Sequence, residues 1–171
     1  MIIHTIGHSN HPIETFLAML EAHGIRLVAD VRTLPGSRHN PQYNKEALSA
    51  SLQDRGIGYR HLPGLGGLRH AKKDSQNKGW KNAGFRGYAD YLQTEEFAVA
   101  LAELQELAKD QPTAILCAEA VPWRCHRSLI ADTLTVRGTT VLHIMSAASV
   151  KEHTLTIFAQ VSGTTITYPE P

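Results

Sequence analysis

Reactive side chains are concentrated in one short stretch, between Cys117 and Arg127. The residues before it, 114–116, are apolar, and Pro122 cannot donate a ladder hydrogen bond, so a buried strand must end near Cys117. The residues after Trp123 predict a helix that begins near Cys125. The groups of this stretch that could do chemistry are Cys117, Glu119, Arg124, Cys125, His126 and Arg127, and they include both cysteines of the chain.

A thiol at a helix start is a candidate nucleophile. The unpaired backbone N–H groups and the positive end of the helix dipole favour a thiolate, and Arg124 and Arg127 add positive charge. We therefore expect the pKa of Cys125 to be lowered and its thiolate to attack an electrophile, with Glu119 and His126 as acid–base candidates. The alternative is that Cys125 only packs as a small apolar residue while the arginines pair with acids.

The same helix start could instead hold an anion. A phosphatase loop is excluded by spacing, because it needs an arginine six positions after the cysteine, whereas Arg124 lies seven after Cys117 with the acidic Glu119 between them. Binding without that chemistry remains open, since backbone N–H groups at a helix start bind phosphate, sulfate or carboxylate.

More basic residues follow a second predicted strand, which ends at Asp30–Arg32. Arg32 and Arg38 could grip a phosphate with planar guanidinium groups, or Asp30 could hold an arginine in an internal salt bridge. Tyr88 and Tyr91 could stack on a nucleobase or complete the edge of the core. The predicted ligand-binding residues are His8, Ser9, Arg32, Ser37, Arg38, Arg124, Arg127, Tyr88 and Tyr91, and the predicted catalytic residues are Cys125, Glu119 and His126.

Length and composition predict a single domain over residues 1–171. An apolar fraction of 42% is enough for a core without disulfides, and a formal charge of +1 favours neither nucleic acid nor membrane as a partner of the whole surface. We expect a cytoplasmic protein with free thiols, because the chain has no signal segment and no apolar run that could span a bilayer. The histidines and cysteines lack metal-ligand spacing, so we expect neither a metal nor another cofactor.

Strands and helices alternate along most of the chain. We predict strands at 2–6, 25–31, 58–62, 114–116 and 140–144, and helices from about 12, at 45–55, 85–92 and 95–109, and at 125–137. This pattern predicts an α/β fold with a mainly parallel sheet of about five strands flanked by helices, whose sites lie at the carboxyl ends of the strands. Residues 149–160 are weakly helical at best, and 164–168 predict a small edge strand.

The segment 63–84 is a long loop rich in glycine and basic residues. Its excess of lysine and arginine, extended by Arg86, would suit a nucleic-acid-associated module with a strong salt dependence. This is the second alternative to the function that we expect, which is binding of an anionic small molecule or nucleic-acid fragment, with enzyme activity left open. The first alternative is a thiol-dependent or redox-responsive enzyme that uses Cys125.

Several short motifs together resemble one known family. They are Thr5-Ile-Gly-His-Ser9, Asp30-Val-Arg32, Pro35-x-Ser-Arg38, Leu62-Pro-x-Leu-Gly-Gly67, Tyr88-Ala-Asp-Tyr91, Cys117-Ala-Glu119 and Cys125-His-Arg127, with Glu152-His153 and Tyr168-Pro169 near the end. In this order they resemble the family called domain of unknown function 488. The resemblance implies a small bacterial or archaeal cytosolic α/β domain, and it implies no particular activity.

Overall fold

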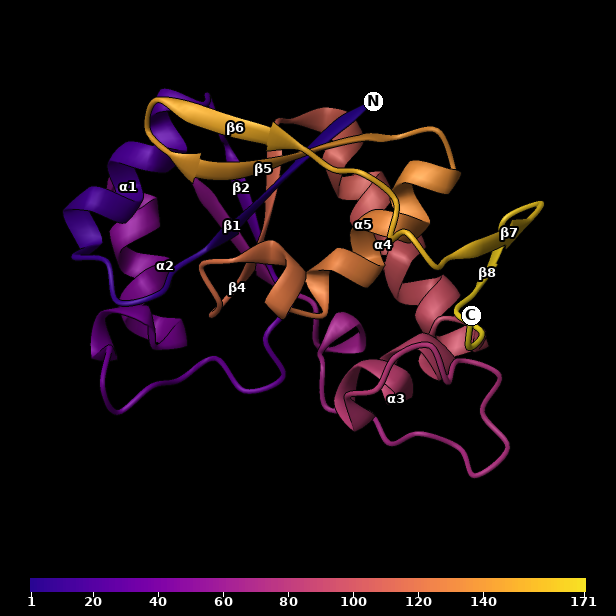
Figure 1. Ribbon diagram of the computed structural model, residues 1–171. Helices are drawn as coiled ribbons and strands as arrows, with labels where there is room; N and C mark the ends of the chain where they lie inside the picture. Colours follow the sequence, from indigo (N-terminus) through magenta and orange to yellow (C-terminus); the bar gives the residue numbers. More distant parts are fainter.

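The computed structural model describes residues 1–171 (Figure 1). Six strands form one sheet in the order β3–β2–β4–β1–β5–β6. Five of them run parallel, and only β6 is antiparallel to its neighbour β5. The predicted mainly parallel α/β sheet is confirmed. The strands are β1 (Ile2–Gly7), β2 (Leu27–Asp30), β3 (Gly58–His61), β4 (Thr113–Cys117), β5 (Thr140–Ser146) and β6 (Ser149–Glu152).

Helices cover both faces of the sheet. They are α1 (Ile13–Ala22), α2 (Lys45–Asp54), α3 (Ala83–Tyr91), α4 (Glu95–Asp110) and α5 (Arg127–Val136). Figure 1 shows α1 and α2 on one side of the strands and α4 and α5 on the other. Two separate apolar clusters match this arrangement, one built on α1 and α2 and one on α3, α4 and α5. None of the helices combines the length and the apolar character that crossing a membrane requires.

Residue alternation along β4 decides which face each side chain serves. Ala114 and Leu116 belong to the α1/α2 cluster, and Ile115 and Cys117 belong to the cluster on the other face. Successive side chains of a strand point to opposite faces, so this division follows directly from the sequence positions. Cys117 therefore faces α5.

The sheet has a topological switch around β4. The helix that follows β4 lies on the opposite face from the helices that follow its two neighbours, β1 and β2. The loops after these strands must diverge, and a crevice opens at their carboxyl ends, which is where parallel α/β sheets bind ligands. These ends lie toward the bottom of Figure 1.

The start of α5 differs from its prediction. Pro122 opens a short 3-10 turn, Pro122–Arg124, and Cys125 then has extended backbone before the helix begins at Arg127. The fixed φ of proline favours such a turn, and the turn ends before the helix can form. Cys125 consequently precedes the helix instead of lying in its first turn.

In the C-terminal region the prediction is wrong for residues 149–152, whereas a strand is present within 164–168. Residues 149–152 form β6, which folds back on β5 through a tight turn, so this part of 149–160 is strand. The predicted edge strand at 164–168 does not join the main sheet. It corresponds to β8 (Thr165–Thr167), which pairs with β7 (Gln160–Ser162) in a separate two-stranded sheet.

Candidate thiol site at the carboxyl ends of the strands

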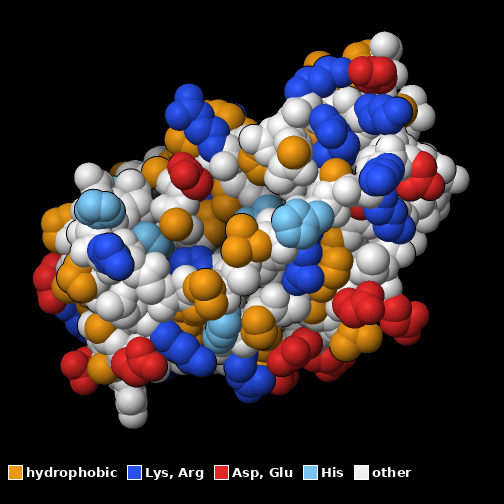
Figure 2. Space-filling model, turned by 90° about the horizontal axis from the view of Figure 1, so that it is seen from below, with side chains coloured by type: hydrophobic (Ala, Val, Ile, Leu, Met, Phe, Trp, Pro, Cys, Tyr) orange, Lys and Arg blue, Asp and Glu red, His pale blue; other side chains and the backbone are white.

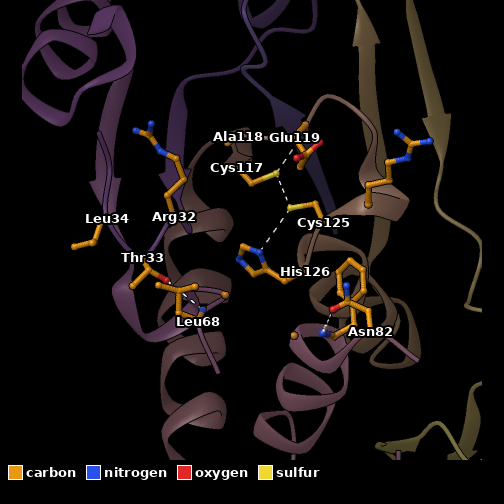
Figure 3. Close-up of a pocket in the computed structure, with 14 residues that line it drawn as sticks. Arg32, Thr33, Leu34, Leu68, Asn82, Cys117, Ala118, Glu119, Cys125 and His126 are labelled. Carbon is orange, nitrogen blue, oxygen red and sulfur yellow. Dashed lines mark hydrogen bonds between the residues drawn. The ribbon is translucent and has the colours of Figure 1, made fainter. Parts of the chain in front are cut away.

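A cavity of about 400 Å³ opens beside the carboxyl ends of β2 and β4. In Figure 2, which views the molecule from below, the surface is hollowed near its centre, with hydrophobic, histidine and basic side chains around the hollow. Figure 3 shows the same region in detail, with two sulfur atoms at its centre. The cavity is lined by Arg32, Thr33, Leu34, Gly67, Leu68, Asn82, Gly84, Phe85, Cys117, Ala118, Glu119, Arg124, Cys125 and His126.

The two cysteines form a close pair of free thiols. Cys117 ends β4 and Cys125 ends the Pro122–Arg124 turn, and their Sγ atoms are 2.7 Å apart. Both residues line the cavity although both are largely buried. The Cys125 thiol donates to the Cys117 sulfur, whose own thiol can donate to the backbone carbonyl of Glu119 at 3.6 Å. No disulfide joins the two cysteines in this structure.

Arg127 is a buried cation without an ion pair. It is only 1% exposed, and the salt bridges of the protein do not include it. Its guanidinium donates to the backbone carbonyls of Glu119 at 2.9 Å and Ala120 at 3.0 Å, and to the Thr5 hydroxyl at 3.3 Å. Its Nε–H has no partner. Arg127 fixes the loop after β4 from beneath and does not line the cavity.

The charge of Arg127 acts on both thiols, which nevertheless differ. Burial raises the pKa of Cys117, but the thiol donated by Cys125 and the charge of Arg127 more than offset this, and the pKa lies below its ordinary value. Burial and the neighbouring Cys117 raise the pKa of Cys125 well above its ordinary value. The predicted lowered pKa for Cys125 is therefore wrong, because burial raises it and the Cys125 thiol donates its proton to Cys117. Cys117 is the thiol that ionises first.

His126 lies beside the thiol pair as a neutral imidazole. Burial is the main reason that its pKa falls to about 4. Its Nε2–H donates to the carbonyl of Val31 at 3.1 Å, which leaves Nδ1 as an acceptor 3.6 Å from the Cys125 sulfur. A Cβ atom on Gly67 would meet Nδ1 at 2.7 Å, so a glycine is needed where the loop passes over this ring.

Arg32 makes the internal salt bridge that was one of its two predicted roles. Its Nε and NH2 groups donate to the Asp30 carboxylate at 3.0 and 2.7 Å, and NH1 faces His8 Nε2 at 3.4 Å. Figure 3 shows the guanidinium directed away from the sulfur atoms. A second hollow, adjoining the first through Arg32, Leu34, Ala118 and Glu119, contains the predicted residues His8, Ser9 and Ser37.

The other predicted residues are divided between the cavity and its surroundings. Glu119 and Arg124 line the cavity, are exposed, and have no side-chain hydrogen bond or ion pair. Arg38 is exposed and does not line it. Tyr88 is fully buried and donates to the carbonyl of Leu65, while Tyr91 donates to Gly64. Both tyrosines support the loop under the cavity instead of facing it.

A hydrogen-bonded chain behind the thiol pair was not predicted. His143 Nδ1 is 2.6 Å from the Thr5 hydroxyl, and its Nε2 is 2.9 Å from His153 Nδ1. His153 Nε2 is 2.7 Å from Asp132, which also accepts from Thr156 and Tyr168. The chain joins Asp132 to Thr5 and hence to Arg127. It had no local signal in the sequence, because its members come from β1, α5, β5 and the C-terminal segment.

The basic loop is organised by a buried acid. The Asp90 carboxylate accepts from the backbone N–H of Lys72 and from the side chains of Ser75 and Asn77. The lysines of this loop remain exposed, and basic side chains gather at the upper right of Figure 2. No group of three or more His, Cys, Asp or Glu side chains is arranged to hold a metal ion.

The fold and site define an α/β protein with a pair of free thiols at the switch point of a mainly parallel sheet. The chain belongs to the family described as Domain of unknown function DUF488, whose family model matches residues 12–134. The matched segment contains the whole cavity lining, and the hydrogen-bonded chain extends beyond it through His143 and His153. The chain matches neither a curated protein nor a solved structure.

Proposed function

We propose that the protein is a thiol-dependent enzyme in which Cys117 and Cys125 together reduce a small disulfide. The observation that carries this proposal is the buried Arg127, whose charge has no carboxylate partner and acts on two thiols with their sulfur atoms 2.7 Å apart. An unpaired buried charge is costly. A thiolate on Cys117 compensates it, and a thiolate is the reactive form of cysteine.

The reaction takes place in two exchange steps. The Cys117 thiolate attacks one sulfur of the substrate, the substrate S–S bond breaks, and one half leaves as a thiolate that takes a proton from water. The Cys125 sulfur then attacks Cys117 in the mixed disulfide, and its proton passes to His126 Nδ1 as the bond between Cys117 and the second half of the substrate breaks. The second half leaves and takes the proton from His126. In sum, the protein dithiol becomes a disulfide and the substrate becomes two thiols.

The geometry supports the second step. A disulfide bond is about 2.05 Å long, so the two sulfur atoms need to approach by only a fraction of an ångström. The neutral His126 has a free acceptor, Nδ1, which lies 3.6 Å from the Cys125 sulfur. A low-molecular-weight thiol returns the protein to its dithiol form, and we place the reaction in the cytoplasm because thiols are kept reduced there.

Trapping the mixed disulfide tests this function. Cys125→Ser leaves Cys117 without its resolving partner, so treatment with cystine should give a stable adduct on Cys117, detected by intact-protein mass spectrometry. Cys117→Ser should give an adduct at least about tenfold more slowly, because Cys125 is the weaker acid. Equal rates for both variants, or no adduct on either, would contradict the proposal.

The second candidate function is binding of a small anion without thiol chemistry. It is supported by Arg124, an exposed guanidinium that lines the cavity and makes no ion pair. Calorimetric titration with inorganic phosphate tests it. Binding that is lost in Arg124→Ala but kept in Arg26→Ala, a variant of an exposed arginine outside the cavity, would favour this candidate; no heat with the wild type would exclude it for phosphate.

A further inference from the structure

The mouth of the thiol cavity carries one free charge of each sign. Glu119 and Arg124 both line it, both are exposed, and neither has a partner in the protein. Apart from the two reactive thiols, the remaining ionisable groups of the lining leave no other free charge: Arg32 is held by Asp30, and the pKa of His126, about 4, keeps that side chain neutral. A ligand in this cavity therefore meets one anion and one cation.

Both charged residues lie close to a cysteine along the chain. Glu119 lies two residues after Cys117, and Arg124 directly precedes Cys125. Consecutive Cα atoms are about 3.8 Å apart, so each charged residue is at most about 8 Å along the backbone from a reactive cysteine. Figure 3 shows the Glu119 carboxylate on the same side of the cavity as the sulfur pair. The complementary ligand has its own two charges close to its own sulfur.

The rest of the lining suits a short apolar connection between these groups. Leu34, Leu68 and Phe85 provide apolar surface, and the cavity volume is about 400 Å³. This size fits a small molecule.

We propose that the substrate is a small disulfide of the α-amino-acid class, in which an ammonium and a carboxylate group lie near the sulfur, with Glu119 binding the ammonium and Arg124 the carboxylate. This inference rests on the proposed disulfide reduction and names its substrate class. Cystine is the simplest member: the protein dithiol and one cystine give the protein disulfide and two cysteines.

Three probe disulfides separate charge recognition from simple reactivity. The reduced wild-type protein is mixed with cystine, with the dication cystamine, or with the dianion 3,3′-dithiodipropionate, and disulfide formation is followed by stopped flow. We expect cystine to react about tenfold faster than either probe of single sign at low salt, with the preference reduced at high salt. Each rate is compared with that of the same probe and free cysteine, to correct for intrinsic reactivity.

Charge reversal should invert the preference. Glu119→Lys makes both mouth charges positive, so dithiodipropionate should become the fastest probe; Arg124→Glu should make cystamine the fastest. Glu46→Lys and Arg26→Glu produce the same changes in net charge at exposed positions outside the cavity, and they should keep the wild-type order.

The outcomes separate the two proposals. If all three probes oxidise the thiols at equal corrected rates in every variant, the substrate class is wrong while disulfide reduction stands. If the charge reversals leave the wild-type order unchanged, Glu119 and Arg124 do not select the substrate. If no probe oxidises the thiols, the proposed function itself fails.

Discussion

At the scale of single residues, the central feature is Arg127. Its side chain is buried, and its guanidinium donates to a hydroxyl and to backbone carbonyls instead of a carboxylate. This positive charge is one of the causes that lower the pKa of Cys117, because it favours the ionised form of the thiol. Arg127, which the sequence predicted as an anion-binding residue, therefore lies behind the cysteines, where its charge lowers the pKa of their thiols.

Removing the charge of Arg127 should make Cys117 a weaker acid. In Arg127→Gln the pKa of Cys117 should rise, so the midpoint of its alkylation by iodoacetamide, measured against pH with peptide mapping, should move to higher pH. Arg127→Lys keeps the charge and should retain most of the wild-type profile, while losing about 1–3 kcal/mol of stability with the paired carbonyl contacts.

Arg26→Gln, which removes an exposed charge outside the cavity, is the matched control and should leave the profile unchanged. A folded Arg127→Gln protein with the wild-type alkylation midpoint would contradict the assigned role of Arg127.

At the scale of elements, one hydrogen-bonded chain ties the C-terminal segment to the thiol site. Asp132 on α5 accepts hydrogen bonds from His153, Thr156 and Tyr168, and His153 leads through His143 to β1. The carboxylate is fully buried, so its partners are the only groups that satisfy it. This chain, together with the apolar contacts of Tyr168, holds the small β7–β8 sheet against α5 and the core.

Asp132→Asn should lower the free energy of unfolding by about 3 kcal/mol, because a neutral amide replaces a carboxylate that accepts several hydrogen bonds and places its NH2 group against their donors. Urea denaturation measures this change. Asp110→Asn, an exposed change at the end of α4, should be nearly neutral. Similar stabilities for the two variants would show that the chain is not a significant contributor.

The loop over His126 gives a second prediction at this scale. In Gly67→Ala the new Cβ atom would lie 2.7 Å from Nδ1, so the ring or the loop must move. Resolution of the mixed disulfide by Cys125 should slow about tenfold or more, measured as release of the second thiol, while the first exchange step should change little. Gly36→Ala, where the nearest atom is 3.7 Å away, is the control. Unchanged resolution would exclude His126 as the base.

At the scale of the whole molecule, buried neutral histidines make the fold sensitive to acid. The pKa values of His126 and His143 fall to about 4 and about 3, mainly through burial. The unfolded chain takes up these protons below its ordinary pKa of about 6.5, before the folded chain does. Stability is therefore fully present above pH 6.5 and falls between pH 6.5 and 4.

As the pH falls through that window, each of these histidines should lower the free energy of unfolding by about 1.4 kcal/mol per pH unit. His126→Gln should remove the contribution of one histidine, so the slope of the free energy of unfolding against pH should become smaller. Urea denaturation at several pH values measures this slope. Stability that is constant between pH 6.5 and 4.5 in the wild type would contradict the buried neutral state of these side chains.

Sequence reasoning reached the architecture and the segment that carries the site, because alternation and periodicity are local properties. The strand before Cys117, the crevice at the strand ends and the free thiols all follow from residue order and type. It could not reach the direction of the Arg127 side chain, which depends on carbonyl groups presented by the loop after β4. The hydrogen bond between Asp132 and His153 could not be predicted from the sequence either, since this contact depends on how the chain returns after β6.

The equilibrium between dithiol and disulfide tests the central claim most directly. The wild-type protein is equilibrated in buffers of defined cysteine-to-cystine ratio, and intact-protein and peptide mass spectrometry follow its thiols. We predict a single two-electron transition in which both thiols are lost together and a Cys117–Cys125 disulfide forms. Two thiols that stay reduced at every ratio, or that form only separate mixed disulfides, would contradict the assignment of these cysteines as a reactive pair.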